Sequence, residues 1–203
     1  MNQKMYIPSH FAADAEEILR NIQAADLITL TDDGLVATYL PFVYDPDQKT
    51  LQGHVARNNA QWKQATRHEA LVIVHGPSGY VTPSWYATKA DHGRVVPTWN
   101  YLTAHVYGEL VVHDDPEWLG SLVRRLTDKH ERGREHPWSV DDAPAAYVAG
   151  QLRAIVGVEL RISRVEAKAK FSQNRSAEDV DGVIAGLEGA GEHEHAQAVR
   201  AAR

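Results

Sequence analysis

The sequence of 203 residues contains no cysteine. This absence excludes a disulfide framework, thiolate chemistry and cysteine-ligated zinc or iron–sulfur centres. The chain also has no apolar run near the ~20 residues that a membrane helix needs, and no basic-then-apolar leader opens it. We therefore expect a cytoplasmic protein with no membrane partner.

Positive charge is scarce, because 21 Lys and Arg residues stand against 27 Asp and Glu residues, which gives a formal net charge of -6. A net negative charge repels a polyanion such as DNA, although a local basic patch could override this repulsion. We see no convincing helix-turn-helix pattern either. DNA is thus a possible partner that the charge does not support.

Several chemical motifs are missing. No Walker loop, Gly-x-Gly-x-x-Gly, His-Glu-x-x-His or Gly-x-Ser-x-Gly pattern occurs. The eleven histidines show no metal-ligand spacing, so we predict no metal site. His10, His105 and Lys170 are candidate proton donors by their chemistry alone. The sequence identifies no catalytic residue and leaves open whether the protein is an enzyme.

The most informative stretch runs from Trp99 to His113, where residues sort by parity as in a strand with one buried face. The even positions form an apolar row in which Asn100 is the single polar member. The odd positions mix aromatic, hydroxyl and imidazole side chains, which suits an interface or a flat ligand. A contiguous patch of this kind is not left in water, so we predict a homodimer.

Two prolines bound this region, because proline is excluded from the middle of a sheet. Pro83 and Pro97 make the chain leave the sheet, with a polar loop expected over residues 87–94. Trp85 and Trp99 lie beside these breaks. Each tryptophan taken alone is more commonly an ordinary strand residue, but their crowding favours a functional role.

The remaining pattern predicts a mainly β protein with peripheral helices (α+β). Asp32-Asp33-Gly34 predicts a hairpin, and a second one follows around Asp45 to Gln48. Helices are expected over 14–22, 116–132 and 143–155, and a capping box at Ser176 and Asp179 opens another. A change of phase near Ser163 predicts a β-bulge or a change of strand. We expect one domain over residues 1–203, with a C-terminal helical extension at about 175–203 and a polar tail from Glu192 that frays.

A strand that ends at Arg57 and opens a helix with Asn58 or Asn59 at the cap combines free N–H groups, a helix dipole and a guanidinium. Those features suit a phosphate. An ordinary strand-to-helix junction with a solvated arginine would give the same pattern.

Four blocks together resemble the PaiB family of FMN-binding split-barrel proteins, which are related in fold to pyridoxamine phosphate oxidases. They are Met5 to Phe11, His54 to Trp62, Tyr80 to Tyr86 with Val96 to Tyr101, and Lys170 to Arg175. The blocks occur in the family's order over nearly the whole chain. The resemblance implies a split β-barrel, a homodimer with FMN at the subunit interface, and a role as a negative transcriptional regulator. A flavin-dependent oxidoreductase is the alternative, with a haem-handling protein as a more distant relative, since each needs the same flavin cradle.

With FMN as the implied cofactor, its groups can be matched to side chains. We predict that Arg57, Asn58 and Asn59 bind the phosphate, and that Gln61 and Trp62 line the same pocket. Trp85, Trp99 and Asn100 are expected at the isoalloxazine ring. Lys170, Ser172 and Gln173 would reach the ring from the partner subunit.

Overall fold

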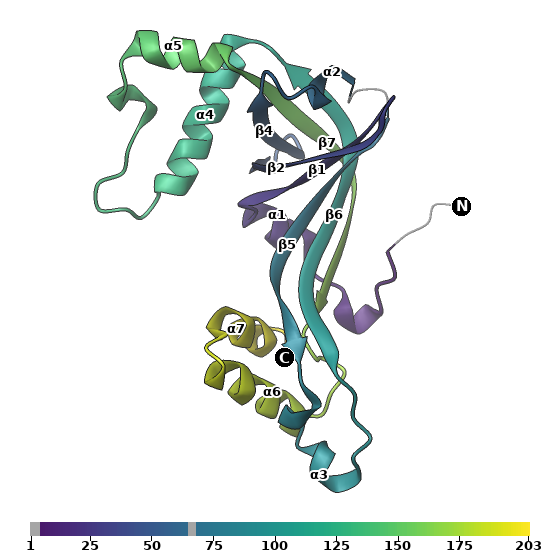
Figure 1. Cartoon of the computed structure of the whole chain (residues 1–203). Helices are drawn as coiled ribbons and strands as arrows, with labels where there is room; N and C mark the ends of the chain where they lie inside the picture. The colour runs from purple at the N-terminus through teal and green to yellow at the C-terminus, as the bar shows by residue number, and fades with distance from the viewer. Residues whose placement is uncertain (1–4, 65–67) are drawn as a thin grey trace. The chain divides into compact units, whose positions relative to one another are not determined.

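The computed structural model describes residues 5–64 and 68–203. Seven strands form a sheet in the order β2-β1-β5-β6-β7-β4-β3 (Figure 1). The pairs of β1 with β2 and β5, and of β4 with β3 and β7, are antiparallel. The strands are β1 Ala24–Thr31, β2 Gly34–Pro41, β3 Val43–Asp45, β4 Thr50–Ala56, β5 Ala70–Val81, β6 Thr98–His113 and β7 Ile155–Lys170.

Short and long helices accompany the strands in each unit, which confirms a mainly β fold with peripheral helices. They are η1 Ser9–Phe11, α1 Ala15–Arg20, α2 Gln61–Gln64, η3 Pro83–Trp85, α3 Thr88–His92, α4 Pro116–Glu131, η4 Val140–Asp142, α5 Ala145–Arg153, α6 Ala177–Gly189 and α7 His193–Ala201. Within the described residues, no helix is long and apolar enough to cross a bilayer.

The chain divides into two compact units. Unit 1 comprises residues 1–15, 75–104 and 166–203, and unit 2 comprises residues 16–74 and 105–165. Strands β5, β6 and β7 contribute residues to both units. The single domain with a C-terminal extension stays a prediction.

The first hairpin of unit 2 follows the predicted turn. β1 pairs with β2 in a register that places Thr31 opposite Gly34, so Asp32 and Asp33 form the connection. Gly34 has a φ of 110°, a conformation that residues with a β-carbon rarely adopt. The second hairpin, between β3 and β4, is also confirmed.

The parity expected for β6 is confirmed at five of its seven even positions, whereas Leu102 and Val112 are only partly buried. Asn100 and Ala104 are buried in unit 1, and Val106, Gly108 and Leu110 are buried in unit 2. A β-carbon on Gly108 would lie 2.1 Å from the carbonyl oxygen of Arg161, so glycine allows β7 to pass close by at this point.

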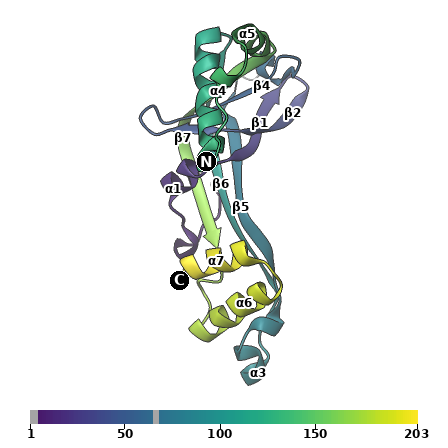
Figure 2. The same ribbon diagram turned by 90° about the vertical axis from the view of Figure 1, so that its left-hand side faces the viewer.

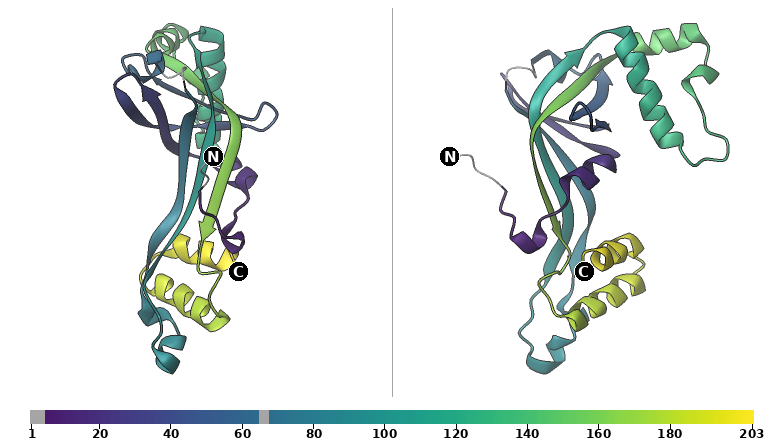
Figure 3. Two further views of the ribbon diagram at one scale, coloured as in Figure 1. Left: turned by 90° about the vertical axis from the view of Figure 1, so that its right-hand side faces the viewer. Right: turned by 180° about the vertical axis from the view of Figure 1, so that it is seen from behind.

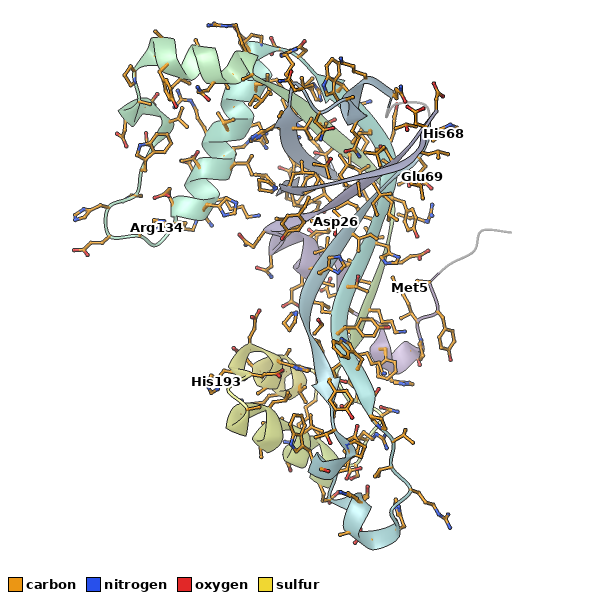
Figure 4. The ribbon with its side chains drawn as sticks, in the orientation of Figure 1. Met5, Asp26, His68, Glu69, Arg134 and His193 are labelled. Atoms are coloured by element: carbon orange, nitrogen blue, oxygen red, sulfur yellow. The ribbon has the colours of Figure 1, made fainter. Side chains whose placement is uncertain are left out.

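Helix α4 packs in unit 2 through its apolar side, with Leu119, Leu122 and Leu126 buried. Its first turn is capped by Asp115, whose carboxylate accepts a hydrogen bond of 2.8 Å from the backbone N–H of Trp118. The charged connection from α4 towards α5 (Figure 3) includes Arg134, which Figure 4 labels. It contains no helix or strand until η4.

In unit 1, helices α6 and α7 lie side by side and close a second apolar core (Figure 2). The expectation of a frayed tail from Glu192 is wrong, because His195, Ala196 and Val199 of α7 are buried there. Small and polar residues at these positions give a weak apolar signal in the sequence.

Three further expectations need correction. β7 is one strand of 16 residues, so the phase change near Ser163 is no change of strand, and the β-bulge stays a prediction. The polar loop at 87–94 contains a short helix, α3. The Ser176 hydroxyl does cap α6, but the carboxylate of Asp179 bonds Thr88 instead of closing the capping box.

Candidate functional site

Arg57 follows β4 directly, and its guanidinium is bound within unit 2. Nε donates to the carbonyl of Arg153 over 2.7 Å, and Nη2 donates to the carbonyl of Ile155 over 3.0 Å. Nη1 donates to Asp114 Oδ2 over 3.0 Å, and Nη2 also bonds Asp114 Oδ1. The predicted anchor for a phosphate therefore already holds a carboxylate.

This pair is open to solvent, with 37% of the Arg57 side chain and 56% of the Asp114 side chain exposed. The hydrogen bonds from Arg57 hold the pKa of Asp114 below its ordinary value, and those to Asp114 raise the pKa of Arg57. Both groups are charged at neutral pH. Sequence reasoning missed Asp114, because nothing in the spacing of residues 57 and 114 links them.

The two asparagines differ in their contacts. Asn59 Oδ1 accepts from the backbone N–H of Gln61 over 3.0 Å, so Asn59 is the residue that opens α2. Its amide also donates to the Thr38 hydroxyl over 2.9 Å. Asn58 is exposed and its amide has no hydrogen-bond partner within residues 5–64 and 68–203. Of the two amides, that of Asn58 is available to a ligand.

Gln61 and Trp62 have contacts of their own in unit 2. Gln61 is only 4% exposed, and its Nε2 lies within hydrogen-bond distance of the carbonyls of Leu27 and Val36. These bonds tie α2 to the first hairpin. Trp62 Nε1 donates to the Arg57 carbonyl over 3.1 Å, which fixes the indole beside Arg57.

A pocket of about 290 Å³ adjoins the Arg57–Asp114 pair. Apart from these two residues it is lined by one further arginine and by apolar side chains: Arg153, Pro116, Leu119, Ala149 and Leu152. Arg153 is exposed and forms no ion pair with any carboxylate in the described part of the chain. The pocket thus offers two guanidinium groups against one carboxylate.

The residues predicted at the flavin ring lie in unit 1, and two of them meet. Asn100 is fully buried, and its amide nitrogen donates to the Ser172 hydroxyl over 3.2 Å. Ser172 has a φ of 68°, in the left-handed region, where the chain leaves β7. This turn is closed by Gln173, whose amide accepts from the Phe171 N–H over 2.6 Å and donates to the Ala169 carbonyl over 2.7 Å.

Lys170 ends β7 beside the start of β6. Its ammonium donates to the Thr98 hydroxyl over 2.5 Å. It makes no ion pair with a carboxylate in residues 5–64 and 68–203. A half-buried cation with only a neutral partner is a suitable donor for an anionic ligand.

The two tryptophans are used differently. Trp99 is 53% exposed, so its indole is available to a flat ligand or a partner. Trp85 packs into the core formed with α6, where its ring lies against Gly186. The structure places Trp85 in this core, and its contact with a flavin stays a prediction.

The outer face of β6 is less free in unit 2 than its aromatic content indicates. The guanidinium of Arg164 lies 3.5 Å from the centre of the Tyr107 ring. Glu69, at the start of β5 (Figure 4), accepts two hydrogen bonds from Arg164 and holds it there. Of the candidate proton donors, His105 contacts the Tyr107 ring in unit 2, whereas His10 and Lys170 belong to unit 1.

The predicted site residues thus form two groups. Arg57, Asn58, Asn59, Gln61 and Trp62 lie together in unit 2, with Asp114 and Arg153. Trp99, Asn100, Lys170, Ser172 and Gln173 lie in unit 1, as does Trp85. Their donor chemistry fits FMN: guanidinium and amide groups in the first group suit a phosphate, and an exposed indole with a cation in the second suits a flavin ring.

Fold and donor set together define a flavin-binding protein of the split-barrel class. A family model described as "Putative FMN-binding domain" matches residues 5–164. The chain belongs to this FMN-binding family, of which PaiB is a member, and FMN is the cofactor that this membership assigns to it.

A relative shares the family, and two solved structures share the fold. The chain is 34% identical over 191 residues to "Protease synthase and sporulation protein PAI 2" of Bacillus subtilis (strain 168), covering 91% of this chain and 89% of the relative. The flavocytochrome Anf3 from Azotobacter vinelandii shares the fold with a TM-score of 0.57 at 15% identity, over 83% of this chain and 73% of that one. An FAD and haem binding protein from Mycobacterium smegmatis gives 0.54 at 19% identity, over 85% and 80%. These likenesses confirm the predicted split-barrel fold.

Proposed function

We propose that this FMN-binding chain acts as a homodimeric negative transcriptional regulator of the PaiB type. The observation that carries the flavin site is Lys170, whose ammonium donates to the neutral Thr98 hydroxyl and pairs with no carboxylate among the described residues. Positive charge of this kind favours a reduced, anionic flavin.

The ring would be held by unit 1. Trp99 offers an exposed flat surface. Asn100, the next residue in the chain, contributes an amide, and Ser172 contributes the hydroxyl that is hydrogen-bonded to that amide. When bound, FMN would supply redox chemistry at its ring. The chain's own residues would bind it, orient it and place a positive charge beside it.

The phosphate would be held by unit 2 at Arg57, with the free amide of Asn58 close by in sequence. Loss of a charge-assisted hydrogen bond costs roughly 1.5–3 kcal/mol, so Arg57→Ala should weaken FMN binding about tenfold to a hundredfold. Fluorescence titration of the apo-protein with FMN and with riboflavin separates phosphate recognition from ring recognition. Equal binding of FMN by Arg57→Ala and wild type, at matched melting temperature, would place the phosphate elsewhere.

Exposed apolar side chains support the homodimer. Tyr80, Val96 and Trp99 are at least half exposed in unit 1, and Leu35 and Tyr39 are exposed on the edge strand β2 of unit 2. Apolar surface of this kind is commonly covered by a second subunit. Light scattering at micromolar concentration should give twice the chain mass, and a monomer would contradict both the dimer and a flavin site between subunits.

The regulatory part rests on membership of the PaiB family, whose Bacillus subtilis relative is named for protease synthesis and sporulation. Because the net charge is -6, DNA affinity should be weak and steeply dependent on salt. Anisotropy titrations at two salt concentrations test this expectation. No binding even at low salt would contradict direct contact with DNA.

A flavin-dependent oxidoreductase is the second candidate, and the same Lys170 favours it, since a cation near the ring stabilises a reduced flavin. Structural neighbours with this fold include a flavocytochrome and a haem-binding protein. The visible spectrum of purified protein with FMN decides between the candidates. Bleaching on addition of NAD(P)H, followed by recovery in air, supports the enzyme; an unchanged spectrum supports the regulator.

A further inference from the structure

The Arg57–Asp114 pair bears directly on how a phosphate could bind. Arg57 uses four hydrogen bonds, two to backbone carbonyls and two to the Asp114 carboxylate. The carbonyl bonds hold the arginine in place, whereas the Asp114 side chain is more than half exposed, so water can solvate its carboxylate once it leaves Arg57. A phosphate that binds this guanidinium must compete with Asp114.

The surroundings allow such an exchange. The pocket of about 290 Å³ beside the pair has room for a phosphate group, and its second guanidinium, that of Arg153, has no carboxylate partner among the described residues. Asp114 begins the segment after β6, and the next residue, Asp115, caps α4. Asp114 can therefore leave Arg57 without loss of the helix cap.

We propose that Asp114 occupies, on Arg57, the place of the FMN phosphate and is displaced when the phosphate binds. This inference rests on the proposed phosphate site at Arg57. A phosphate dianion carries enough charge to displace this carboxylate from Arg57. Riboflavin has no anionic group, so it gains no binding energy from Arg57. Asp114 thus lowers the affinity for every ligand of Arg57 and leaves the affinity for riboflavin untouched.

The test uses the full-length apo-protein titrated with FMN and with riboflavin. Asp114→Asn removes the negative charge and keeps the shape of the side chain. An exposed ion pair of this type corresponds to about a twofold to fivefold change in an equilibrium constant. We expect Asp114→Asn to tighten FMN binding by that factor and to leave riboflavin binding unchanged.

Asp115→Asn is the matched control. It changes the net charge by the same amount one residue away, its side chain can still cap α4, and it does not contact Arg57. Its FMN affinity should equal that of the wild type. An equal gain in both variants would show a general charge effect and overturn the inference.

A double-mutant cycle assigns the gain to Arg57. In an Arg57→Ala background, Asp114→Asn should no longer tighten FMN binding. If the gain persists, or if Asp114→Asn changes FMN and riboflavin binding alike, Asp114 does not compete at Arg57. If the wild type prefers FMN to riboflavin and the cycle shows no coupling, only this inference fails; if the wild type does not bind FMN, the proposed function fails with it.

Discussion

The indole of Trp85 lies against the backbone of Gly186 in α6. A β-carbon on Gly186 would come within 2.3 Å of Trp85 Cδ2 and 2.5 Å of Cγ, which are ring atoms near the stem of the side chain. The helix can approach the ring this closely because glycine stands at that position. Trp85, expected at a flavin, is thus also a core residue of unit 1.

Gly186→Ala should destabilise the protein by about 1–3 kcal/mol, because a well-packed core tolerates an extra methyl group poorly. Urea unfolding followed by tryptophan fluorescence measures the effect. Gly189→Ala, at the end of the same helix, is the control: a β-carbon there meets nothing within 4 Å. It should be neutral or stabilising by up to ~1 kcal/mol through helix propensity. Equal stability of the two variants would show that the contact carries no packing constraint.

Gln61 is expected to contribute to stability more than its place in a helix of four residues indicates. Its buried amide bonds the carbonyls of Leu27 and Val36 and the hydroxyls of Thr29 and Thr38. Gln61→Ala removes these bonds, although the Thr38 hydroxyl keeps its bond from the Asn59 amide, and the loss should cost about 1–3 kcal/mol. Gln64→Ala at the end of the same helix removes one bond, to the Asp32 N–H, and serves as the control. A similar melting temperature for both variants would contradict this role.

These contacts show which features were visible in the sequence. The hairpin at Asp32 and the parity of β6 follow from neighbours in the chain, so local pattern was sufficient to predict them. Arg57 was singled out correctly as a cation at a helix start, but its partner Asp114 is 57 residues away and no spacing rule links the two. Asp179 was assigned to a capping box by its position, and the structure turns its carboxylate to Thr88.

The burial of His54 should make the free energy of unfolding depend on pH. Burial lowers the pKa of this histidine, and its Nδ1 has no hydrogen-bond partner among the described residues. The unfolded chain therefore binds a proton at higher pH than the folded chain does. The free energy of unfolding is therefore highest above the unfolded pKa of about 6.5, where His54 is neutral in both states. It decreases as the pH falls towards the folded pKa, because the unfolded chain takes up the proton first.

We expect the free energy of unfolding of the wild type to fall between pH 7.5 and pH 5.5 by more than that of His54→Leu. Urea titrations at four pH values measure the difference in slope. His130→Leu, which replaces an exposed imidazole on α4, controls for the loss of a histidine as such. Parallel slopes for wild type and His54→Leu would contradict the role of His54.

The last prediction concerns Ser172, where two costs can be measured separately. The Ser172 hydroxyl pairs the fully buried Asn100 amide, and its backbone is held at a φ of 68°. Ser172→Ala removes the hydroxyl and keeps a β-carbon in the left-handed region. Loss of the partner of a buried amide should destabilise the protein by about 1–3 kcal/mol.

Ser172→Gly removes the same hydroxyl but relieves the backbone, because glycine adopts positive φ without a steric penalty. The left-handed conformation costs about 1–2 kcal/mol for a residue with a β-carbon. Glycine also makes the unfolded chain more flexible, which offsets part of the gain by about 0.4–1 kcal/mol. We therefore expect Ser172→Gly to be less destabilised than Ser172→Ala, by up to about 1 kcal/mol in urea unfolding. If alanine proves as stable as serine, Asn100 does not depend on this hydroxyl; if glycine is the less stable of the two variants, the turn after β7 carries no left-handed strain that glycine can relieve.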